Sequence, residues 1–437
     1  MSESTNAPRE ITPCSHTIDA AVDLPGSKSI TNRALVLAAL ADGESTLRGA
    51  LDSDDTRAML GALAALGVGV KHDASSATVR VAGRGVFPAR HAQVWAASSG
   101  TTARFLTAAL ALSPGRYTLD GSEQMRRRPL GDLIDALAML GARVDSAGGF
   151  LPLTTGEFTP RGEENLSCRV RGSISSQFLS ALLMASPLAG GRLEITVAEP
   201  IVSRPYIEMT AAMMRAFGCA LAADASCTRF EIPQGAAYSP REYDIEPDAS
   251  AASYFFALAA ILGGRVTVKR LTRAALQGDV GFVDCLSAMG CEVVEEQNAL
   301  SVYRDENKPL KGIDIDMNAI SDTAQTLSVV ALFADGPTRI RHIAHVRAKE
   351  TDRIGAVVSQ LRRLGAEVEE FEDGLAVTPR RRRYHGAVID TFDDHRMAMS
   401  FSLAGLVIPG VAIENPGCVA KTFPDYFDRL SAALAKN

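Results

Sequence analysis

A three-residue segment that ends in an apolar residue followed by a glycine occurs five times in this chain. This repeat constrains the fold more than any other feature of the sequence. The copies are about 75 residues apart: ALG (65–67), MLG (139–141), AFG (216–218), AMG (288–290) and RLG (363–365). Each ends an amphipathic helical pattern, because a glycine just past the last helical residue is the usual stop. A strand-like stretch such as ARVDS or AEVEEF follows, so the sequence predicts a repeated α/β unit.

A second, more apolar helical pattern precedes each copy and also occurs once more near the C-terminus. The six segments are RALVLAALADGESTLRGA, RFLTAALALSPGRYTLDG, FLSALLMASPLAGGRLEITVA, YFFALAAILGGRVTVKRL, TLSVVALFADGPTRIRHI and MAMSFSLAGLVIPGVAIEN. The sixth unit lacks its last strands, whereas HTIDAAVDLPG near the N-terminus alternates apolar and polar residues as a strand does. We therefore expect this N-terminal strand to complete the last unit.

The repeats predict two domains of three units each. The first domain is expected to hold residues 1–26 and 246–437 (repeats 4–6), and the second residues 27–245 (repeats 1–3). The chain would cross between them at LPGSK and at IEPDAS. The alternative is that helices ending in a glycine recur by chance, as they can in any α/β protein.

Composition excludes several classes of protein. The chain has 437 residues, 46% hydrophobic and 22% charged, which is typical of a globular protein of two domains. Its net charge of −6 argues against a nucleic-acid or anionic-membrane partner. Seven cysteines without a CxxC pair indicate a reducing compartment and no structural zinc. With no signal-peptide pattern and no apolar run of roughly 20 residues, we expect a cytoplasmic protein.

The starts of the six apolar helices differ between the two halves. In the first half they read PGSKSITNR, ASSGTTAR and GSISSQ, and in the second EPDAS, AISDTAQT and TFDDHR. Helix capping explains one Ser, Thr or Asp in each. It does not explain Lys28, Arg33, Arg104 and Arg396, which are cations near the positive ends of helix dipoles. Helix N-termini that face a gap between the domains would bind an anion there.

Further cations support a ligand with several negative groups. Arg126, Arg127 and Arg128 are adjacent in MRRRPL, and Lys421 precedes a helix expected to start at a proline. Lys349 and Arg353 are four residues apart, which on a helix would place them on one face. Each of these residues taken alone is more often a solvated surface charge.

Competing motifs are weak. GSKS lacks the spacing of a phosphate-binding P-loop. RRRR (380–383) reads as a solvated loop between strands rather than a nucleic-acid patch. RHIAH and DDH lack further ligands at metal-binding spacing, so we expect no metal site.

The segments LPGSKSITNRALVLAALA, LDGSEQMRRRPLGDLIDAL, SISSQFLSALLMA, KETDRI, DDHRMAMS and AKTFPDYF occur in this order. Together they resemble the EPSP synthase (3-phosphoshikimate 1-carboxyvinyltransferase) family of enolpyruvyl transferases over essentially the whole chain. The resemblance implies an inside-out α/β barrel in two domains, six βαβαββ repeats, and an active site in the interdomain cleft. It implies transfer of the enolpyruvyl group of phosphoenolpyruvate to shikimate 3-phosphate, with release of phosphate, on the shikimate pathway to chorismate and aromatic amino acids. It also implies a monomeric enzyme that is a target of glyphosate and needs no cofactor.

The resemblance also implies roles for individual residues. The residues expected to bind shikimate 3-phosphate are Lys28, Ser29, Arg33, Ser175, Ser176, Gln177, Ser203, Tyr206, Asp322, His345 and Lys349. Those expected at phosphoenolpyruvate are Lys28, Gly100, Arg128, Gln177, Arg353, Arg396 and Lys421. Asp322 is the expected general base, and Lys28 and Glu350 are two open alternatives for the proton donor.

The chain departs from the family pattern at three places. Ser98-Ser99-Gly100-Thr101 stands where the family usually has Asn-Ala-Gly-Thr, and Phe105 stands where it has Pro. His345 stands where Asn is common, and a neutral imidazole replaces only part of the hydrogen bonding of an amide.

Two other functions remain open alternatives. UDP-N-acetylglucosamine enolpyruvyl transferase shares the fold and the donor, but its flexible loop carries a Cys before Arg-Pro, and here the loop reads SEQMRRRP. A non-catalytic sensor on the same fold is the second, and the presence of Lys28, Asp322 and Glu350 argues against it.

Overall fold

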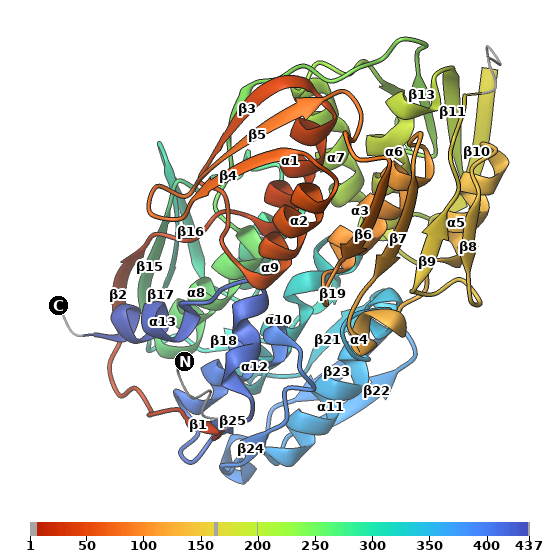
Figure 1. Ribbon diagram of the computed structural model, residues 1–437. Coiled ribbons are helices and arrows are strands. Elements are labelled where there is room, and N and C mark those ends of the chain that lie inside the picture. Colours follow the sequence, from red (N-terminus) through yellow and green to blue (C-terminus); the bar gives the residue numbers. More distant parts are fainter. Residues whose placement is uncertain (1–6, 161–164, 199, 436–437) are drawn as a thin grey trace. The chain divides into compact units, whose positions relative to one another are not determined.

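The computed structural model describes residues 7–160, 165–198 and 200–435, and its internal contacts divide the chain into two units. Unit 1 comprises residues 1–25 and 247–437, and unit 2 comprises residues 26–246. Each unit combines helices with several small mixed sheets, so the fold is mixed α/β (Figure 1).

Six helices, three in each unit, are buried on almost every side. They are α1 (Lys28–Leu40), α3 (Gly100–Ala111) and α6 (Ser176–Ala185) in unit 2, and α8 (Ala249–Leu262), α10 (Ala324–Val330) and α12 (His395–Gly405) in unit 1. In α8 every residue from 249 to 261 is buried, as expected of a helix that is apolar all round. Side chains cap five of the six: Ser27, Ser99, Ser175, Asp248 and Asp394 each accept a backbone N–H of the first turn.

The second set of helices is amphipathic and covers these buried ones. It consists of α2 (Asp54–Ala65), α5 (Gly131–Met139), α7 (Arg204–Ala216), α9 (Phe282–Ala288), α11 (Arg353–Arg363) and α13 (Tyr426–Leu434). The first five are followed, one residue past the C-cap, by Gly67, Gly141, Gly218, Gly290 and Gly365, all with φ between +81° and +106°. This left-handed conformation is open to glycine and costly for other residues. The predicted helix ends are therefore confirmed.

The three sheets of unit 2 share one layout. In each, two parallel strands are followed by an antiparallel pair, in the orders β14-β3-β5-β4, β6-β7-β9-β8 and β10-β11-β13-β12. The strands are β3 (Asp42–Arg48), β4 (Gly69–Asp73), β5 (Thr78–Arg84), β6 (His91–Trp95), β7 (Arg116–Asp120), β8 (Val144–Ser146), β9 (Leu153–Thr155), β10 (Asn165–Arg171), β11 (Arg192–Ala198), β12 (Ala222–Ala223), β13 (Arg229–Ile232) and β14 (Glu242–Asp244).

Unit 1 repeats the layout in the orders β16-β17-β15-β2 and β19-β21-β23-β22, and holds a three-stranded sheet β1-β25-β24 and a two-stranded one, β18-β20. Its strands are β1 (Arg9–Glu10), β2 (Ile18–Val22), β15 (Gly264–Lys269), β16 (Glu292–Glu296), β17 (Ala299–Arg304), β18 (Leu310–Lys311), β19 (Asp314–Asp316), β20 (Ala334–Asp335), β21 (Thr338–Arg341), β22 (Glu367–Phe371), β23 (Gly374–Thr378), β24 (Val388–Ile389) and β25 (Ala412–Ile413). Short helices α4 (Glu123–Arg126), η1 (Ser186–Ala189), η2 (Gly278–Gly281), η3 (Asn318–Thr323), η4 (Ala331–Phe333), η5 (Ala344–Ala348), η6 (Arg381–Arg383) and η7 (Pro416–Lys421) join these elements.

The N-terminal strand pairs differently from the expectation. β2 is a strand as predicted, but it pairs in parallel with β15 and so belongs to the fourth repeat rather than the last (Figure 1). The last repeat is instead completed by β1, which pairs with β25. In the same way β14, which precedes α8 in the chain, pairs with β3 beside α1. The two strands that directly precede a chain crossing, β2 and β14, therefore each pair within the unit that the chain then leaves.

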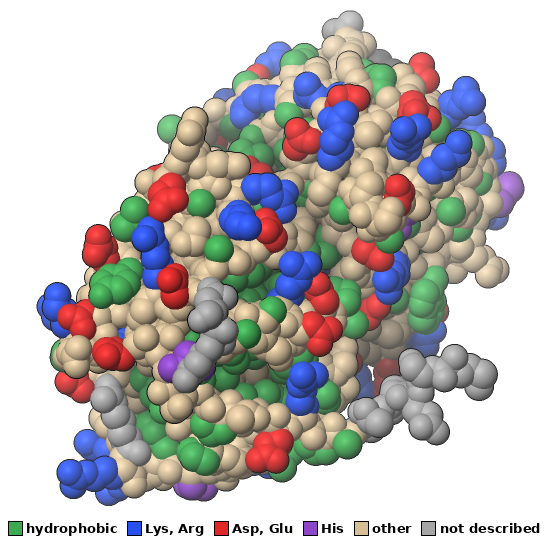
Figure 2. Space-filling view, turned by 90° about the vertical axis from the view of Figure 1, so that its left-hand side faces the viewer, with side chains coloured by type: hydrophobic (Ala, Val, Ile, Leu, Met, Phe, Trp, Pro, Cys, Tyr) green, Lys and Arg blue, Asp and Glu red, His purple; other side chains and the backbone are tan. Residues whose placement is uncertain are grey.

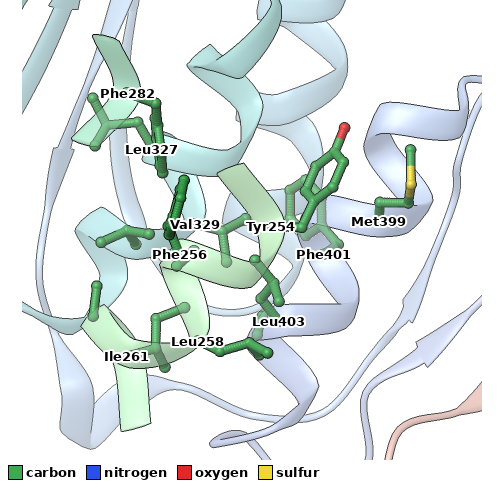
Figure 3. Close-up of a cluster of buried hydrophobic side chains, with 14 of the residues drawn as sticks. Tyr254, Phe256, Leu258, Ile261, Phe282, Leu327, Val329, Met399, Phe401 and Leu403 are labelled. Atoms are coloured by element: carbon green, nitrogen blue, oxygen red, sulfur yellow. The ribbon is translucent and has the colours of Figure 1, made fainter. Parts of the chain in front are cut away.

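The core of unit 1 is formed where four helices meet. Figure 3 shows Tyr254, Phe256, Leu258 and Ile261 of α8 beside Phe282 of α9, Leu327 and Val329 of α10, and Met399, Phe401 and Leu403 of α12. All of these residues except Ile261 are at most 1% exposed. Truncation of one of the phenylalanines to Ala would cost about 3–5 kcal/mol of stability.

No helix in the described part of the chain is long and apolar enough to cross a membrane. On the face shown in Figure 2, the Lys and Arg side chains are interspersed with Asp and Glu. The described side chains on that face therefore form no extended patch of a single charge.

Candidate active site

The start of helix α1 carries a cation that is paired inside unit 2. Ser27 caps the helix by accepting the N–H of Ile30, and Lys28 is the first helical residue. The Lys28 Nζ lies 3.3 Å from Oδ2 of Asp55, a buried residue of α2. This carboxylate offsets the unfavourable placement of a cation at the positive end of the helix dipole.

Arg33 lies one turn further along α1 and is almost fully buried, at 1% exposed. Its Nε donates to Thr210 Oγ1 (2.7 Å), and its Nη2 donates to Ser180 Oγ (3.2 Å) and to the Tyr206 carbonyl (3.3 Å). Its Nη1 donates to the Ser29 carbonyl at 3.0 Å. Burial lowers the pKa of the guanidinium to about 10. Arg33 thus joins α1, α6 and α7 and brings together three predicted positions: Ser29, Arg33 and Tyr206.

The start of α6 holds the other small polar residues. Ser175 caps the helix by accepting the N–H of Gln177, and Ser176 is buried. The Gln177 Oε1 accepts from Arg104 Nη1 at 2.7 Å. Arg104 lies in α3, is 3% exposed and stacks over the Phe178 ring at 5.3 Å. The predicted site set omitted Arg104, although its place near a buried helix start singled it out in the sequence.

Ser203, at the start of α7, has a left-handed backbone with φ 52° and ψ 46° and is buried. A non-glycine residue in this region carries strain, which proteins concentrate at functional sites.

Gly100 and Arg128 are in direct contact. Arg128 follows the short helix α4 and is buried. A Cβ atom built on Gly100 would lie 2.8 Å from both Nη1 and Nη2 of Arg128. The absence of a side chain at Gly100 therefore allows a guanidinium to lie against the first turn of α3.

In unit 1, Arg353 is the centre of an ionic cluster. Its Nε lies 2.8 Å from Asp394 Oδ2, its Nη2 2.8 Å from Glu350 Oε2, and its Nη1 3.0 Å from Asp322 Oδ1. Burial lowers the pKa of the guanidinium, but these three carboxylates outweigh it and raise the pKa above the ordinary value. Arg353 is therefore always charged.

Asp322 connects Arg353 to two more of the predicted cations. Its Oδ2 accepts from Arg396 Nη2 at 2.8 Å, and its Oδ1 lies 3.9 Å from Lys349 Nζ. Arg396 Nη1 also reaches the hydroxyl of Tyr254 at 3.4 Å, and burial raises the pKa of that tyrosine to about 12. The cluster therefore contains equal numbers of opposite charges: the carboxylates of Asp322, Glu350 and Asp394 and the cations of Lys349, Arg353 and Arg396.

The structure of this cluster differs from the local sequence patterns in two places. Asp322 does not cap its helix: it lies in η3, and α10 begins after Thr323. The prediction that Lys349 and Arg353 share a helical face was wrong, because Lys349 is the C-cap residue after η5 and Arg353 is the first residue of α11, capped by Asp352. The four residues 349–352 between η5 and α11 turn instead, and this turn brings Lys349 and Arg353 to Asp322 and Glu350 to Arg353.

His345 and Lys421 complete the predicted set. His345 Nε2 is 2.9 Å from Ser321 Oγ, and burial, together with the nearby Lys349, lowers the pKa of His345 to about 4. The imidazole is thus neutral at pH 7. Lys421 is buried at the end of η7, and the following helix α13 begins at Tyr426, two residues after Pro424, rather than at the proline.

Among the described residues, no group of three or more His, Cys, Asp or Glu side chains is arranged to hold a metal ion. RRRR (380–383) falls at η6, between β23 and β24, and Arg380 pairs there with Glu367.

Comparison with known proteins gives one family. The family model described as EPSP synthase (3-phosphoshikimate 1-carboxyvinyltransferase) matches residues 14–430. A 3-phosphoshikimate 1-carboxyvinyltransferase of Thiobacillus denitrificans is 52% identical over 93% of this chain and 95% of its own. That of Trichormus variabilis is 46% identical over 94% and 96%.

Solved structures agree in fold. The EPSP synthase of Acinetobacter baumannii superposes with a TM-score of 0.80 at 24% identity, covering 98% of both chains. The enolpyruvyl transferase NikO of Streptomyces tendae superposes with a TM-score of 0.78 at 17% identity.

Proposed function

The chain belongs to the EPSP synthase family, and from this premise we propose how its residues carry out the reaction. It transfers the enolpyruvyl group of phosphoenolpyruvate to the 5-hydroxyl of shikimate 3-phosphate and releases phosphate. The observation that carries this conclusion is the match of the family model over residues 14–430, together with relatives of that name at about half identity.

The chemistry requires three proton transfers in two steps. The methylene carbon of phosphoenolpyruvate gains a proton while the substrate hydroxyl, losing its own proton, bonds to the neighbouring carbon. A proton then leaves the new methyl group as the C–O bond to phosphate breaks, which restores the double bond. Atoms and charge balance without an oxidation step, so acids, bases and cations are sufficient.

Phosphoenolpyruvate carries a phosphate and a carboxylate, and we assign it Arg128, Arg353, Arg396 and Lys421. Arginine suits this ligand because its planar fork donates two parallel hydrogen bonds to either group. The backbone of Gly100 would lie beside the phosphate, because Gly100 already borders the Arg128 guanidinium.

Shikimate 3-phosphate is assigned to the residues gathered at the starts of α1, α6 and α7. Ser175, Ser176 and Ser203 would bind its phosphate, and Ser29, Arg33 and Tyr206 its carboxylate side. Arg33 donates hydrogen bonds to the protein on three of its nitrogens, so we propose that it acts as much by fixing Ser29 and Tyr206 as by direct contact. Gln177 and Lys28 would lie between the two substrates.

Asp322 is proposed as the general base for the shikimate hydroxyl, with Lys349 and His345 beside the same ring. A carboxylate that accepts from two guanidinium groups binds a proton less readily. We therefore propose that Asp322 becomes an effective base when Arg353 and Arg396 turn to phosphoenolpyruvate. For the proton donor, Lys28 next to Asp55 and Glu350 next to Arg353 remain two candidates.

We further propose that each unit is an inside-out barrel of three βαβαββ repeats and that the substrates bind in the cleft between the units. Neither unit alone holds all of the assigned residues, since most of those assigned to shikimate 3-phosphate are in unit 2 and the base, Asp322, is in unit 1. Closure on the ligands would exclude water and strengthen the ionic contacts. The monomeric state and the cytoplasmic location remain predictions.

The direct test is release of phosphate from phosphoenolpyruvate by the purified protein. We expect release with shikimate 3-phosphate, and none without an acceptor or with UDP-N-acetylglucosamine. Release with the nucleotide sugar would identify the other enolpyruvyl transferase. Binding of both substrates without turnover would indicate the sensor.

A further inference from the structure

Two turns of unit 1 lie side by side because of the strands that precede them. β24 and β25 are parallel, with Ile389 opposite Ile413, and the N–H of Glu414 donates to the Ile389 carbonyl at 2.9 Å. Parallel strands end at the same edge of a sheet. The turn after β24 leads into α12, which carries Arg396, and the turn after β25 leads into η7, which ends at Lys421 (Figure 1).

Both turns are strained. Phe392 and Asp393 in the first have φ of 52° and 55°, and Asn415 in the second has φ of 44°. The left-handed region costs a non-glycine residue on the order of 1 kcal/mol, least for Asn and Asp. Three of the nine such residues in the described chain occur here. Strain of this kind persists only where the surrounding contacts over-determine it.

A side-chain hydrogen bond joins the two turns. The Asn415 Nδ2 donates to Asp393 Oδ1 at 3.1 Å. Cys418 of η7 also lies against the first turn: burial chiefly raises the pKa of its thiol to about 12, and the carboxylates of Asp394 and Asp393 act in the same direction.

The first turn is itself anchored in the ionic cluster. Asp394 follows Asp393 directly, has no exposed surface, caps α12 through the N–H of Arg396 (2.9 Å) and binds Arg353 Nε (2.8 Å). The Asp393–Asn415 bond therefore ties the segment that ends at Lys421 to the residue that orients two of the arginines.

We propose that Asp393 and Asn415 are positioning residues that fix Lys421 relative to Arg396 and thereby set the affinity for phosphoenolpyruvate. Neither side chain is assigned to touch a substrate. The proposal rests on the proposed function, which gives both cations to phosphoenolpyruvate. A long lysine side chain at the end of a short 3₁₀ helix is poorly fixed on its own, and small displacements of a binding group weaken binding markedly.

The test is steady-state kinetics of Asn415→Gly with both substrates varied. Glycine adopts φ near +44° without strain, so this variant removes the hydrogen bond and preserves the turn. We expect KM for phosphoenolpyruvate to rise about five- to tenfold, KM for shikimate 3-phosphate to change less than twofold, and the thermal midpoint to stay or rise. Asp393→Asn keeps the acceptor oxygen and the tolerance for the left-handed region, so it should behave as the parent protein does.

Ala77→Gly is the matched control, because it relieves a left-handed residue with φ 49° in unit 2 and removes no side-chain bond. It should leave both KM values unchanged. If Asn415→Gly left KM for phosphoenolpyruvate within twofold, or raised both KM values together with a lower thermal midpoint, the bond would be structural only and the proposal wrong.

The variant Lys421→Met distinguishes failure of the positioning role of Asp393 and Asn415 from failure of the assignment of Lys421 to phosphoenolpyruvate. A rise in KM for phosphoenolpyruvate in Lys421→Met but not in Asn415→Gly overturns the positioning role alone. No rise in Lys421→Met overturns the assignment of Lys421 and the positioning role with it. If both variants raise KM, the double variant should add little to Lys421→Met, as expected of two residues that act through one group.

Discussion

The guanidinium of Arg128 lies so close to Gly100 that a methyl group at Gly100 would meet both of its terminal nitrogens at 2.8 Å. Contacts this short do not occur, so any side chain at Gly100 must displace Arg128. The glycine is thus required by a side chain on another segment of the chain.

Gly100→Ala should therefore weaken phosphoenolpyruvate binding by about 1.5–3 kcal/mol, the value of hydrogen bonds to a charged group, and leave shikimate 3-phosphate binding unchanged. Gly61→Ala in helix α2 is the control, because a Cβ there meets nothing within 4 Å; it should be neutral or slightly stabilising. Calorimetric titration with each substrate measures both effects. Unchanged phosphoenolpyruvate affinity in Gly100→Ala would show that Arg128 can move without loss.

Arg128→Lys tests the same contact from the other side. The charge remains but the planar fork is lost, so phosphoenolpyruvate affinity should fall by about 1.5–3 kcal/mol. Shikimate 3-phosphate affinity should hardly change. Equal weakening of both ligands in calorimetry would make Arg128 a structural residue instead.

Asp322→Asn should lower turnover by roughly 10²–10⁴-fold, the usual contribution of a positioned base. Because Asp322 accepts from Arg353 and Arg396 rather than capping a helix, the variant should also lose about 1.5–3 kcal/mol of stability. Assays of phosphate release and urea unfolding measure the two effects separately.

The control for Asp322 is Asp425→Asn, which removes the exposed partner of Arg429 in the same unit and should cost under about 1 kcal/mol. An Asp322→Asn protein that lost stability but turned over normally would keep Asp322 as an ionic partner and remove it from the proton transfers.

His345 should make stability depend on pH. Its pKa is about 4 in the fold and about 6.5 in an unfolded chain. Between these values the unfolded state binds the extra proton, so stability falls as the pH drops below about 6.5 and is unaffected above it.

Between pH 7.5 and 5.0 the parent protein should lose about 2 kcal/mol more than His345→Asn in urea unfolding. His91→Asn, at an exposed strand position, should follow the parent. Equal losses in the parent and in His345→Asn would contradict the buried neutral imidazole.

The local elements of this protein follow from short stretches of its sequence. The five glycines past the helix ends, the caps Ser27, Ser99, Ser175, Asp248 and Asp394, and strand β2 were all predictable. The glycines depend on the conformational range of one residue, the caps on one nearby hydrogen bond, and the strand on the period of its apolar residues. Each of these signals involves residues only a few positions apart in the sequence.

Which of these elements contact one another depends on the packing of each whole unit. β2 pairs with β15, and β14 pairs with β3. These partners depend on how whole helices pack, and no local sequence pattern specifies that packing. Asp322 binds Arg353 and Arg396, 31 and 74 residues away, because the starts of α11 and α12 converge on η3. The partners of a side chain, and therefore its role, depend on which helix starts come together in the fold. The helix start itself depends only on the few residues that form it.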